Sequence, residues 1–518
     1  MAPAKPFETS QGNDASAGDF LADAYHRLRQ AVPSRDNKRP VLPPSAALTS
    51  AVSALPRTDD PNFLAARGAE ATLSHLLEDI VPALNSQGLS GRYYGFVTGG
   101  ALPIAEAADN IVSALDQNVQ VHIPGHSASP AVEDAALTML IALLDLGKVT
   151  DWPRRTFTTG ATASNIMALA CGREAVIARR LPDDSGDTVA EVGLLAASRA
   201  AGIKQIQILT SSGHSSLSKA ASIVGLGHRA VKELPASTEE PWRLNIDALE
   251  EMLAREGVAS IIAISAGEVN TGRFATNVLD MPKLRSLADR YGAWIHVDGA
   301  FGIFARALPK ADEFLHLHGN VAGLELADSI TADGHKLLNV PYDTGIFFCR
   351  NASIPNQVFM NPNAAYLTAS AAVGGATIQS PLNVGIENSR RFRALPVYAV
   401  LLSEGREGMA AMFIRMVTLA RGIAQFIRDS EQYEWLPSEE ASLESTFIIV
   451  LFKAKDPALN DELVARINET QKMFVSGTVW NGQKAARIAV SSWRVDVDRD
   501  LEFVKELLSS VAAGASRS

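Results

Sequence analysis

The sequence predicts an α/β fold with a mostly parallel central sheet, an N-terminal helical arm and a small α+β domain at the C-terminus. Past Gly91, candidate strands alternate with amphipathic helices, which is typical of a parallel sheet covered on both faces. Before Gly91, prolines interrupt the helical stretches, and after residue 390 a long helical stretch leads into a short mixture of strands and helix. A chain of 518 residues is too long for one ordinary core, so several domains are expected.

The expected elements follow in chain order. Residues 1–19 are polar and rich in small residues, and we interpret them as a disordered lead. In residues 20–90, RPVLPPSA and ALPRTDDPNF break the helices, and we expect this arm to contact another subunit. Residues 91–349 form the large domain, with the candidate strands RTFTTG, QIQILTS, HRAVKEL, ASIIAISAG, AWIHVDG, LADSITAD and TGIFFCR. Helices such as NIDALEEMLAREG and DMPKLRSLADRYG follow several of them.

The C-terminal part of the chain divides into a loop and a small domain. Residues 350–389 are rich in Asn, Ala, Gly, Ser and Pro, and loops of this length are usually lids or disordered segments, so we predict a mobile active-site loop. The stretch SRRFRALPVYAVLLSEGREGMAAMFIRMVTLARGIAQFI, which starts at Ser389, reads as helix, and residues 390–518 continue with FIIVLFKA, ELVARINETQKMF and ARIAVSSWRV. These segments predict a small α+β domain.

Composition excludes several classes of protein. The 47 basic and 57 acidic residues carry no clustered positive charge, so we expect no nucleic-acid partner. Cys171 and Cys349 are far apart, which indicates neither a disulfide framework nor a thiolate metal site. No apolar run reaches the ~20 residues that span a bilayer, so we expect no membrane partner and a cytoplasmic location.

Two short segments, AWIHVDGAFG and SITADGHKLLNVPYDTG, carry the strongest chemical signal. Asp298 ends one predicted strand and Lys336 follows another. A lysine amine can form a Schiff base with the aldehyde of pyridoxal 5'-phosphate, and a carboxylate can keep the pyridine nitrogen protonated so that the ring accepts electrons. Alone, Asp298 could be a helix cap and Lys336 a surface lysine. Together they predict a pyridoxal phosphate site.

Three further positions fit such a site. TFTTGATASNIMALACGRE reads as a strand, a turn and a helix that begins near Thr162, and a helix start suits a phosphate; Ser164 or Asn165 could add a polar contact. His214, at a junction of strand and helix, could lie on the cofactor ring and handle a proton, although a lone histidine is more often a cap. Asn270 or Thr271 could reach the ring hydroxyl.

The chain resembles the group II pyridoxal-phosphate-dependent amino-acid decarboxylases, the family of aromatic-amino-acid and glutamate decarboxylases. The matching stretches, in family order, are YYGFVTGGALP, TTGATASNIMALACGRE, SSGHSSLSKAA, SAGEVNTGRF, IHVDGAFG, DGHKLLNVPYDTG and SRRFRAL. The resemblance implies the fold type I architecture of pyridoxal-phosphate-dependent transferases, an obligate homodimer with sites at the subunit interface, and decarboxylation of an L-amino acid to an amine.

The resemblance also implies roles for single residues. Lys336 would hold the cofactor, Asp298 would pair with its ring nitrogen, and His214 would stack on the ring. The remaining positions are Ala300 on the opposite ring face, Ala161, Thr162 and His335 at the phosphate, and Thr98 and Phe96 on the substrate side. Tyr93 and Tyr94 could line the same pocket but are as readily core residues.

The sequence departs from the family in two places. Relatives that release amines are expected to carry a proton-donating tyrosine shortly before the SRR block, and the interval GGATIQSPLNVGIENSRR has none. Tyr366 lies too far upstream, so His214 or Tyr366 could deliver the proton instead, or the enzyme could be an oxidative aldehyde synthase that releases ammonia and hydrogen peroxide. Asp333-Gly334 before His335 also differs from the Asn-Pro of the aromatic and glutamate enzymes. No arginine stands out as a partner for a side-chain carboxylate, so we expect an aromatic or other apolar amino acid.

Other classes of function fit less well. GHSAS resembles a nucleophile elbow, but Ser129 stands where the second glycine is required. His122 and His126 have helical metal-ligand spacing, but Gly125 and a proline between them argue against a helix, and we expect no metal. An inactive homologue that acts as a binding protein is supported only by the missing tyrosine.

Overall fold

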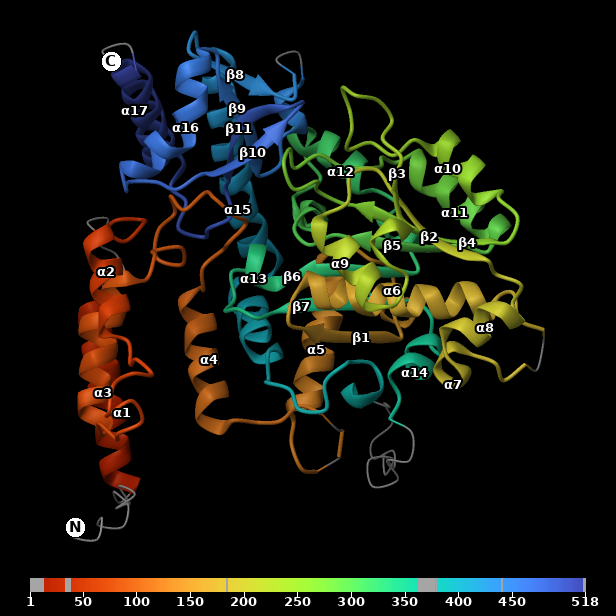
Figure 1. The fold of residues 1–518 in the computed structure, drawn as a ribbon, viewed down its shortest axis with the longest axis horizontal. Helices are drawn as coiled ribbons and strands as arrows, with labels where there is room; N and C mark the ends of the chain where they lie inside the picture. Colours follow the sequence, from red (N-terminus) through yellow and green to blue (C-terminus); the bar gives the residue numbers. More distant parts are fainter. Residues whose placement is uncertain are drawn as a thin grey trace.

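The computed structural model shows three parts, which Figure 1 displays as an arm of helices, a large α/β body and a small domain at one end. The structure describes residues 14–32, 39–120, 122–123, 125–182, 185–361, 378, 380–438 and 441–515. The arm contains α1 (Asp14–Ala31), α2 (Ser45–Ala54) and α3 (Ala69–His75).

A seven-stranded sheet forms the centre of the large body, and all seven strands that the sequence predicts are present. They are β1 (Arg154–Thr158), β2 (Gln205–Thr210), β3 (Val231–Glu233), β4 (Val258–Ser265), β5 (Trp294–Asp298), β6 (Ser329–Asp333) and β7 (Gly345–Cys349). Their order is β1-β7-β6-β5-β4-β2-β3, and β2 to β6 pair in parallel while β7 runs antiparallel to β1 and β6. The mostly parallel sheet is therefore confirmed.

Helices cover both faces of this sheet. They are α4 (Pro103–Leu115), α5 (Ser129–Leu143), α6 (Ala161–Ala178), α7 (Val189–Val192), α8 (Leu194–Ala200), α9 (Ser215–Ile223), α10 (Ile246–Leu253), α11 (Asp280–Tyr291), α12 (Leu315–Val321), α13 (Gly334–Leu337), α14 (Ile354–Phe359) and α15 (Ala394–Arg428). In β4, Ile261 and Ala263 pack into the core under α6, while Ile262 and Ile264 pack into the core of the opposite face. This alternation explains why the strand reads as a continuous apolar run.

The C-terminal domain is a four-stranded antiparallel sheet with two helices, as expected for an α+β unit. Its elements are β8 (Tyr433–Leu436), β9 (Ile449–Ala454), α16 (Pro457–Glu469), β10 (Ser476–Trp480), β11 (Gln483–Ala489) and α17 (Val497–Ala515). The strands β8 and β10 were not predicted from the sequence. The side chains of β10 are only half-buried or exposed, so this strand lacks a continuous apolar run.

Helix α15 joins the large body to the small domain. It contacts α4 and α5 on one side and α17, β8 and β9 on the other. By length and composition it is the one helix among the described residues that could cross a membrane, but half of its most apolar stretch is buried inside the protein, as in a core helix. It is not one continuous helix as expected, because Gly405 leaves the helical conformation with φ 59° and ψ −167°.

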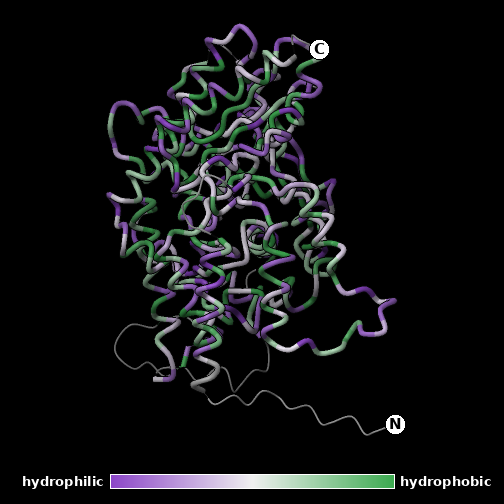
Figure 2. The backbone as a smooth tube through the Cα atoms, turned by 90° about the vertical axis from the view of Figure 1, so that its left-hand side faces the viewer, coloured by the Kyte–Doolittle hydropathy of each residue, from purple (hydrophilic) through white to green (hydrophobic). Residues whose placement is uncertain are grey.

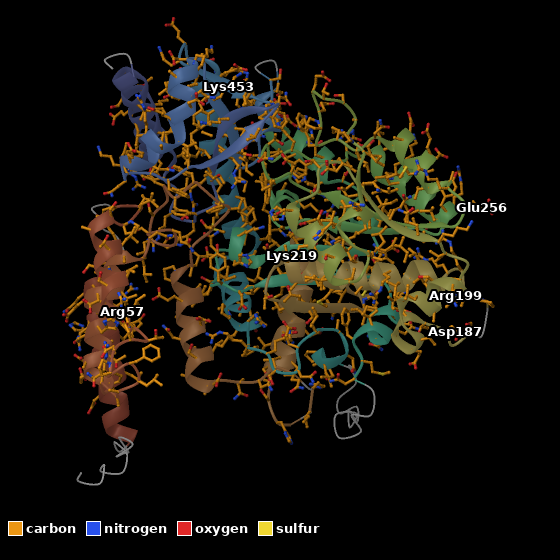
Figure 3. The ribbon with its side chains drawn as sticks, viewed as in Figure 1. Arg57, Asp187, Arg199, Lys219, Glu256 and Lys453 are labelled. Atoms are coloured by element: carbon orange, nitrogen blue, oxygen red, sulfur yellow. The ribbon has the colours of Figure 1, made fainter. Side chains whose placement is uncertain are left out.

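The hydropathy of the chain follows the same layers. Hydrophobic and hydrophilic stretches alternate along the helices (Figure 2), as expected for elements with one face in a core. Charged side chains such as Arg57, Glu256 and Lys453 lie at the periphery (Figure 3).

Two expected boundaries need correction. Helix α1 begins at Asp14, so residues 14–19 are helical rather than part of a disordered lead; Asp14 and Ser16 belong to the residue types that favour helix starts. Residues 354–359 of the predicted loop form α14, which contacts α6 and buries Ile354. The tyrosine at position 366 lies outside the described residues.

Candidate active site

One cavity of about 650 Å³ lies at the carboxyl ends of β4, β5 and β6, where ligands bind in open parallel sheets. Ten of the residues that the sequence predicts for the site line it. They are Phe96, Thr98, Ala161, Thr162, His214, Asn270, Asp298, Ala300, His335 and Lys336. Residues that are widely separated in sequence thus share one site.

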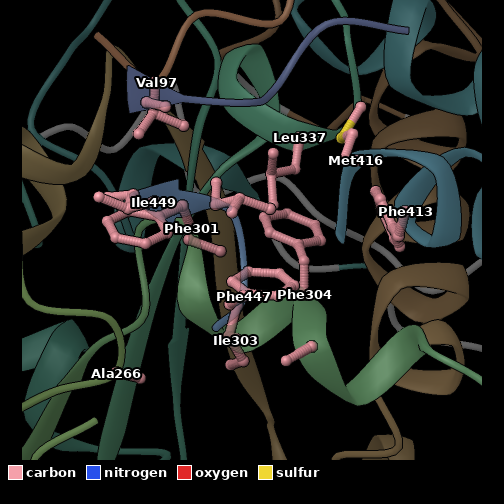
Figure 4. Packing of buried hydrophobic residues seen from close by; sticks show 14 of the residues in the cluster. Val97, Ala266, Phe301, Ile303, Phe304, Leu337, Phe413, Met416, Phe447 and Ile449 are labelled. Carbon is pink, nitrogen blue, oxygen red and sulfur yellow. The ribbon is translucent and has the colours of Figure 1, made fainter. Parts of the chain in front are cut away.

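Lys336 lies in the short helix α13, directly after β6. Its Nζ is 3.0 Å from Oδ2 of Asp333, and Oδ1 of Asp333 accepts a hydrogen bond of 2.7 Å from the backbone amide of Ala161. Asp333 is only 2% exposed, so a buried carboxylate links the lysine to the start of α6. Phe301 lines the cavity and belongs to the same hydrophobic core as Leu337, Phe447 and Ile449 (Figure 4), and Ile449 begins β9.

The start of α6 forms a second wall. The backbone approaches closely there, because a Cβ on Gly345 would lie 2.4 Å from Thr158 Oγ1 and 2.5 Å from the Cα of Gly160. In the first turn of a helix the amides have no intrahelical acceptor, so those of Thr162 and Ala163, which line the cavity, suit a phosphate.

Ser164 and Asn165 do not reach the cavity, contrary to expectation. Ser164 Oγ bonds Thr158 Oγ1 at 2.8 Å, and both Ser164 and Asn165 are completely buried behind the site. They are the fourth and fifth residues of α6, and helical rotation carries their side chains toward the sheet.

Asp298 ends β5 with both carboxylate oxygens occupied. Oδ2 accepts from Nδ2 of Asn165 at 2.8 Å, and Oδ1 accepts from the amide of Ala300 at 3.2 Å. The carboxylate is therefore held in one orientation at the edge of the cavity.

His214 is the N-cap of α9 and lines the cavity, so it combines the two roles that the sequence left open. Its Nδ1 accepts from the amide of Ser216 at 3.1 Å and lies 2.7 Å from Ser216 Oγ. Burial lowers the pKa of His214, and the nearby carboxylate of Asp298 partly offsets this. A neutral His214 therefore carries its hydrogen on Nε2.

His335 and Tyr342 share a side of the cavity. Nδ1 of His335 lies 3.0 Å from the carbonyl of Thr344, and its ring centroid is 4.6 Å from that of Tyr342. Burial lowers the pKa of His335 and raises the pKa of Tyr342 to about 12. Tyr342 was not singled out from the sequence, yet it places a phenol in the cavity.

The predicted substrate side contains both polar and aromatic groups. Thr98 is 6% exposed and its hydroxyl has no hydrogen-bond partner within the described part of the chain. Phe96 is 54% exposed. Asn270 accepts a hydrogen bond of 2.7 Å from Thr478, whereas Thr271 is not among the lining residues.

The two tyrosines before Phe96 belong to the core. Tyr93 and Tyr94 are 7% and 1% exposed, and neither lines the cavity. The sequence left open whether these tyrosines line the pocket or belong to the core, and the structure places them in the core.

Arg487 reaches the cavity from β11 and was not singled out from the sequence. Its Nη1 donates to the carbonyl of Val269 at 2.5 Å and its Nη2 to that of Gly95 at 2.7 Å. Burial lowers the pKa of Arg487 to about 10, and Glu268 partly offsets this. The sequence was interpreted as offering no arginine for a side-chain carboxylate of the substrate, and that expectation stays a prediction. The only sequence signal of Arg487 was the segment ARIAVSSWRV, which alternates like any strand.

These residues together fit pyridoxal phosphate. The cavity offers an amine at Lys336, a carboxylate at Asp298, free helix amides for a phosphate and an unpartnered hydroxyl at Thr98. This donor set on a mostly parallel sheet defines a pyridoxal-phosphate enzyme of fold type I.

The chain belongs to the pyridoxal-dependent decarboxylase family, because residues 107–455 match the pyridoxal-dependent decarboxylase conserved domain. It is 28% identical over 376 residues to L-2,4-diaminobutyrate decarboxylase of Acinetobacter baumannii, which covers 70% of this chain and 68% of that protein. It is 25% identical over 287 residues to phenylacetaldehyde synthase of Arabidopsis thaliana, which covers 54% of this chain and 56% of that protein.

A solved structure shares the whole fold. The crystal structure of Oryza sativa TDC with PLP and tryptamine superposes with a TM-score of 0.77 at 21% identity, over 98% of this chain and 99% of that one. Because the chain belongs to the pyridoxal-dependent decarboxylase family, it is a pyridoxal-phosphate-dependent carboxy-lyase that acts on an amino acid. Its relatives differ in substrate.

His122 and His126 do not have the helical arrangement that a metal-binding pair would need. Gly125 has φ 84°, and it lies in a turn together with His126. Within the described ranges, no three His, Cys, Asp or Glu side chains form a group that could hold a metal ion.

Proposed function

We propose that this enzyme removes the carboxyl group of an aromatic or other apolar L-amino acid and releases carbon dioxide and the amine. The observation that carries the proposal is the presence of Lys336, Asp298, His214 and Arg487 around one cavity. When bound, pyridoxal phosphate supplies an electron sink for the electron pair of the breaking bond to the carboxylate.

Each residue has one task in this proposal. Lys336 would hold the cofactor aldehyde through its amine, and Asp298 would keep a proton on the pyridine nitrogen. His214 would pack on the ring, and Asn270 would contact its hydroxyl. Arg487 binds the substrate carboxylate, since a guanidinium forms paired hydrogen bonds with a carboxylate.

The start of α6 would hold the phosphate. Ala161, Thr162 and His335 would surround it, and Ala300 would pack on the ring face opposite His214. The buried carboxylate of Asp333 now occupies the first amide of that helix, so we propose that the phosphate uses the two following amides.

The charges of the cavity support an apolar side chain. Arg487 is the one arginine among the described lining residues, and if it binds the α-carboxylate no second arginine serves an acidic side chain. The lining carboxylates are those of Asp298 and Asp333, and both already accept hydrogen bonds, so no free carboxylate among the described lining residues serves a basic side chain. Phe96 and Tyr342 are both about half exposed and offer ring surface next to Thr98.

The test is product analysis with a panel of amino acids. The protein with bound pyridoxal phosphate is incubated with aromatic, aliphatic, acidic and basic L-amino acids while carbon dioxide, amine, peroxide and oxygen uptake are followed. We expect equal amounts of carbon dioxide and amine, without peroxide, and the highest kcat/KM for an apolar substrate. Lys336→Ala should lose the visible absorbance and the activity, whereas Lys310→Ala, whose side chain is 80% exposed, should keep both. Release of carbon dioxide only from acidic or basic substrates would contradict the substrate class.

A second candidate reaction is decarboxylation coupled to oxidation, which uses oxygen and water and gives an aldehyde, ammonia, carbon dioxide and hydrogen peroxide. It is favoured by the lack of a tyrosine in residues 374–391. In the same product analysis, peroxide equal to carbon dioxide would identify this reaction.

We further propose a cytoplasmic homodimer in which the arm covers a second copy. The arm exposes large apolar side chains, namely Leu21, Leu48, Val52, Leu64 and Leu76. Exposed apolar surface of this extent is typical of subunit interfaces. Sedimentation should show a dimer that L21E/V52E disrupts, while Leu195→Glu, at a more exposed site on α8, should leave it intact. A cytoplasmic location agrees with the two free buried cysteines.

A further inference from the structure

A chain of buried hydrogen bonds runs from the cavity into the interior of the protein. Nδ2 of Asn165 lies 2.8 Å from Asp298 Oδ2, and Oδ1 of Asn165 lies 2.9 Å from His296 Nε2. His296 Nδ1 lies 3.0 Å from Ser329 Oγ, which is also 3.0 Å from Trp294 Nε1. Behind Asp298, all four members of the chain are 0% exposed.

The carboxylate of Asp298 can only accept and the indole of Trp294 can only donate. Asn165 therefore donates from Nδ2 to Asp298, so its Oδ1 accepts from Nε2 of His296. Burial lowers the pKa of His296, so the ring is neutral and its Nδ1 bears no hydrogen. Nδ1 therefore accepts from the hydroxyl of Ser329, which itself accepts from the indole. A reversed amide would place two acceptors face to face.

A side branch leads from the same amide to a second residue of the cavity. The other hydrogen of Asn165 Nδ2 points to Ser216 Oγ at 3.4 Å, and Ser216 Oγ lies 2.7 Å from Nδ1 of His214. Because Nδ1 already accepts the backbone amide of Ser216, it bears no hydrogen, and the hydroxyl must donate to it. The amide group of Asn165 thus contacts Asp298 directly and His214 through Ser216.

We propose that Asn165 is a positioning residue for the cofactor site, and that His296, Ser329 and Trp294 lock its amide with the NH₂ group toward Asp298. The lock fixes one oxygen of the carboxylate that faces the pyridine nitrogen, while the amide of Ala300 fixes the other. The inference rests on the proposed role of Asp298 toward the cofactor.

The test uses isosteric substitutions in the holoenzyme. Asn165→Asp keeps the shape but loses both donated hydrogens and places a carboxyl beside Asp298. Loss of a hydrogen bond to a charged group should raise the dissociation constant of pyridoxal phosphate roughly 10- to 100-fold. Ser329 lies further from Asp298 in this hydrogen-bond network, so Ser329→Ala should raise the same dissociation constant by a smaller factor.

A matched control separates positioning from simple loss of folding. Gln207 lies in β2 of the same sheet, is 1% exposed, and donates to Met252 O and Ser260 Oγ, each at 3.0 Å. It does not line the cavity. Gln207→Glu should lower the melting temperature but leave the dissociation constant unchanged.

A second readout tests the bond directions themselves. Nitrogen-15 NMR of the histidine rings should show His296 as the neutral tautomer with hydrogen on Nε2, assigned by loss of its signals in His296→Gln. A hydrogen on Nδ1, or an Asn165→Asp dissociation constant no higher than that of Gln207→Glu, would overturn the inference. If the wild-type protein itself shows no Lys336-dependent absorbance, the proposed function fails as well, so the two failures are distinguishable.

Discussion

Replacement of Arg390 should cost more stability than that of its neighbour Arg391, because only Arg390 is buried. Its side chain is 3% exposed, and its Nη2 donates to Glu133 Oε1 at 2.7 Å. The rest of the guanidinium donates at 3.1 Å to Val119 O, Thr156 Oγ1 and Phe157 O. Arg390 thus ties the segment before α15 to α5 and β1.

The magnitude follows from the carboxylate that would be left behind. The side chain of Glu133 is 5% exposed, and within the described residues its Oε2 already has no hydrogen-bond partner. Arg390→Met keeps most of the side-chain volume but leaves the Glu133 carboxylate buried without its partner. Breaking a buried ion pair in this way lowers the free energy of unfolding by about 3–5 kcal/mol. An unfolding entropy of about 2.1 cal/mol/K per residue gives roughly 1.1 kcal/mol/K for 518 residues, so the melting temperature should fall by roughly 3–5 °C.

Thermal unfolding followed by circular dichroism provides the assay, with Arg391→Ala as the control. Arg391 pairs with Asp109 at 2.7 Å, but its side chain is 36% exposed, and such a pair is worth about 0–1 kcal/mol. The control should therefore shift the melting temperature by roughly 1 °C or less. Adding Glu133→Gln to Arg390→Met removes the stranded charge and should recover part of the loss. Equal shifts for both arginine variants would refute the reasoning.

Three further predictions concern the site. Gly345→Ala places a Cβ 2.4 Å from Thr158 Oγ1 and should weaken pyridoxal phosphate binding in an absorbance titration, whereas Gly319→Ala, which meets no atom within 4 Å, should not. Burial raises the pKa of Tyr342 to about 12, so its phenol stays protonated; in an amine-forming enzyme Tyr342→Phe should lower amine yield and raise peroxide, and an unchanged ratio would exclude Tyr342 as a proton donor. Burial lowers the pKa of His296 from 6.5 to about 4, so its neutral form stabilises the fold fully above pH 6.5 and this contribution is lost as pH falls toward 4. The melting temperature should therefore drop between pH 7 and pH 5, and His296→Gln should reduce that drop; an identical drop in the variant would contradict this sign.

The sequence was most informative where local pattern and chemistry coincide. The strands of the large sheet could be located because most of them read as apolar runs between turn residues, as buried strands do. Lys336 and Asp298 could be paired because each follows a strand, and parallel strands end at one edge. The cavity that joins the ten predicted residues confirms their proximity, while their individual roles stay predictions.

Other features depend on tertiary contacts that no local pattern records. Arg487 looks like an ordinary strand residue until β11 is placed beside the large domain. Asn165 was expected at the phosphate, but as the fifth residue of α6 it points its side chain toward Asp298 instead. Helix α1 was missed at its start because a polar, alanine-rich stretch resembles disorder as closely as it resembles a helix.

The hydrogen bond from Arg487 to the carbonyl of Gly95 joins residues 392 positions apart. During synthesis, the lysine and the start of α6 are therefore complete long before the last wall of the cavity exists. A nascent or truncated chain that ends before β11 would hold an exposed lysine amine without the Arg487 guanidinium, which we propose binds the substrate carboxylate. The order of synthesis thus makes the lysine available before the arginine.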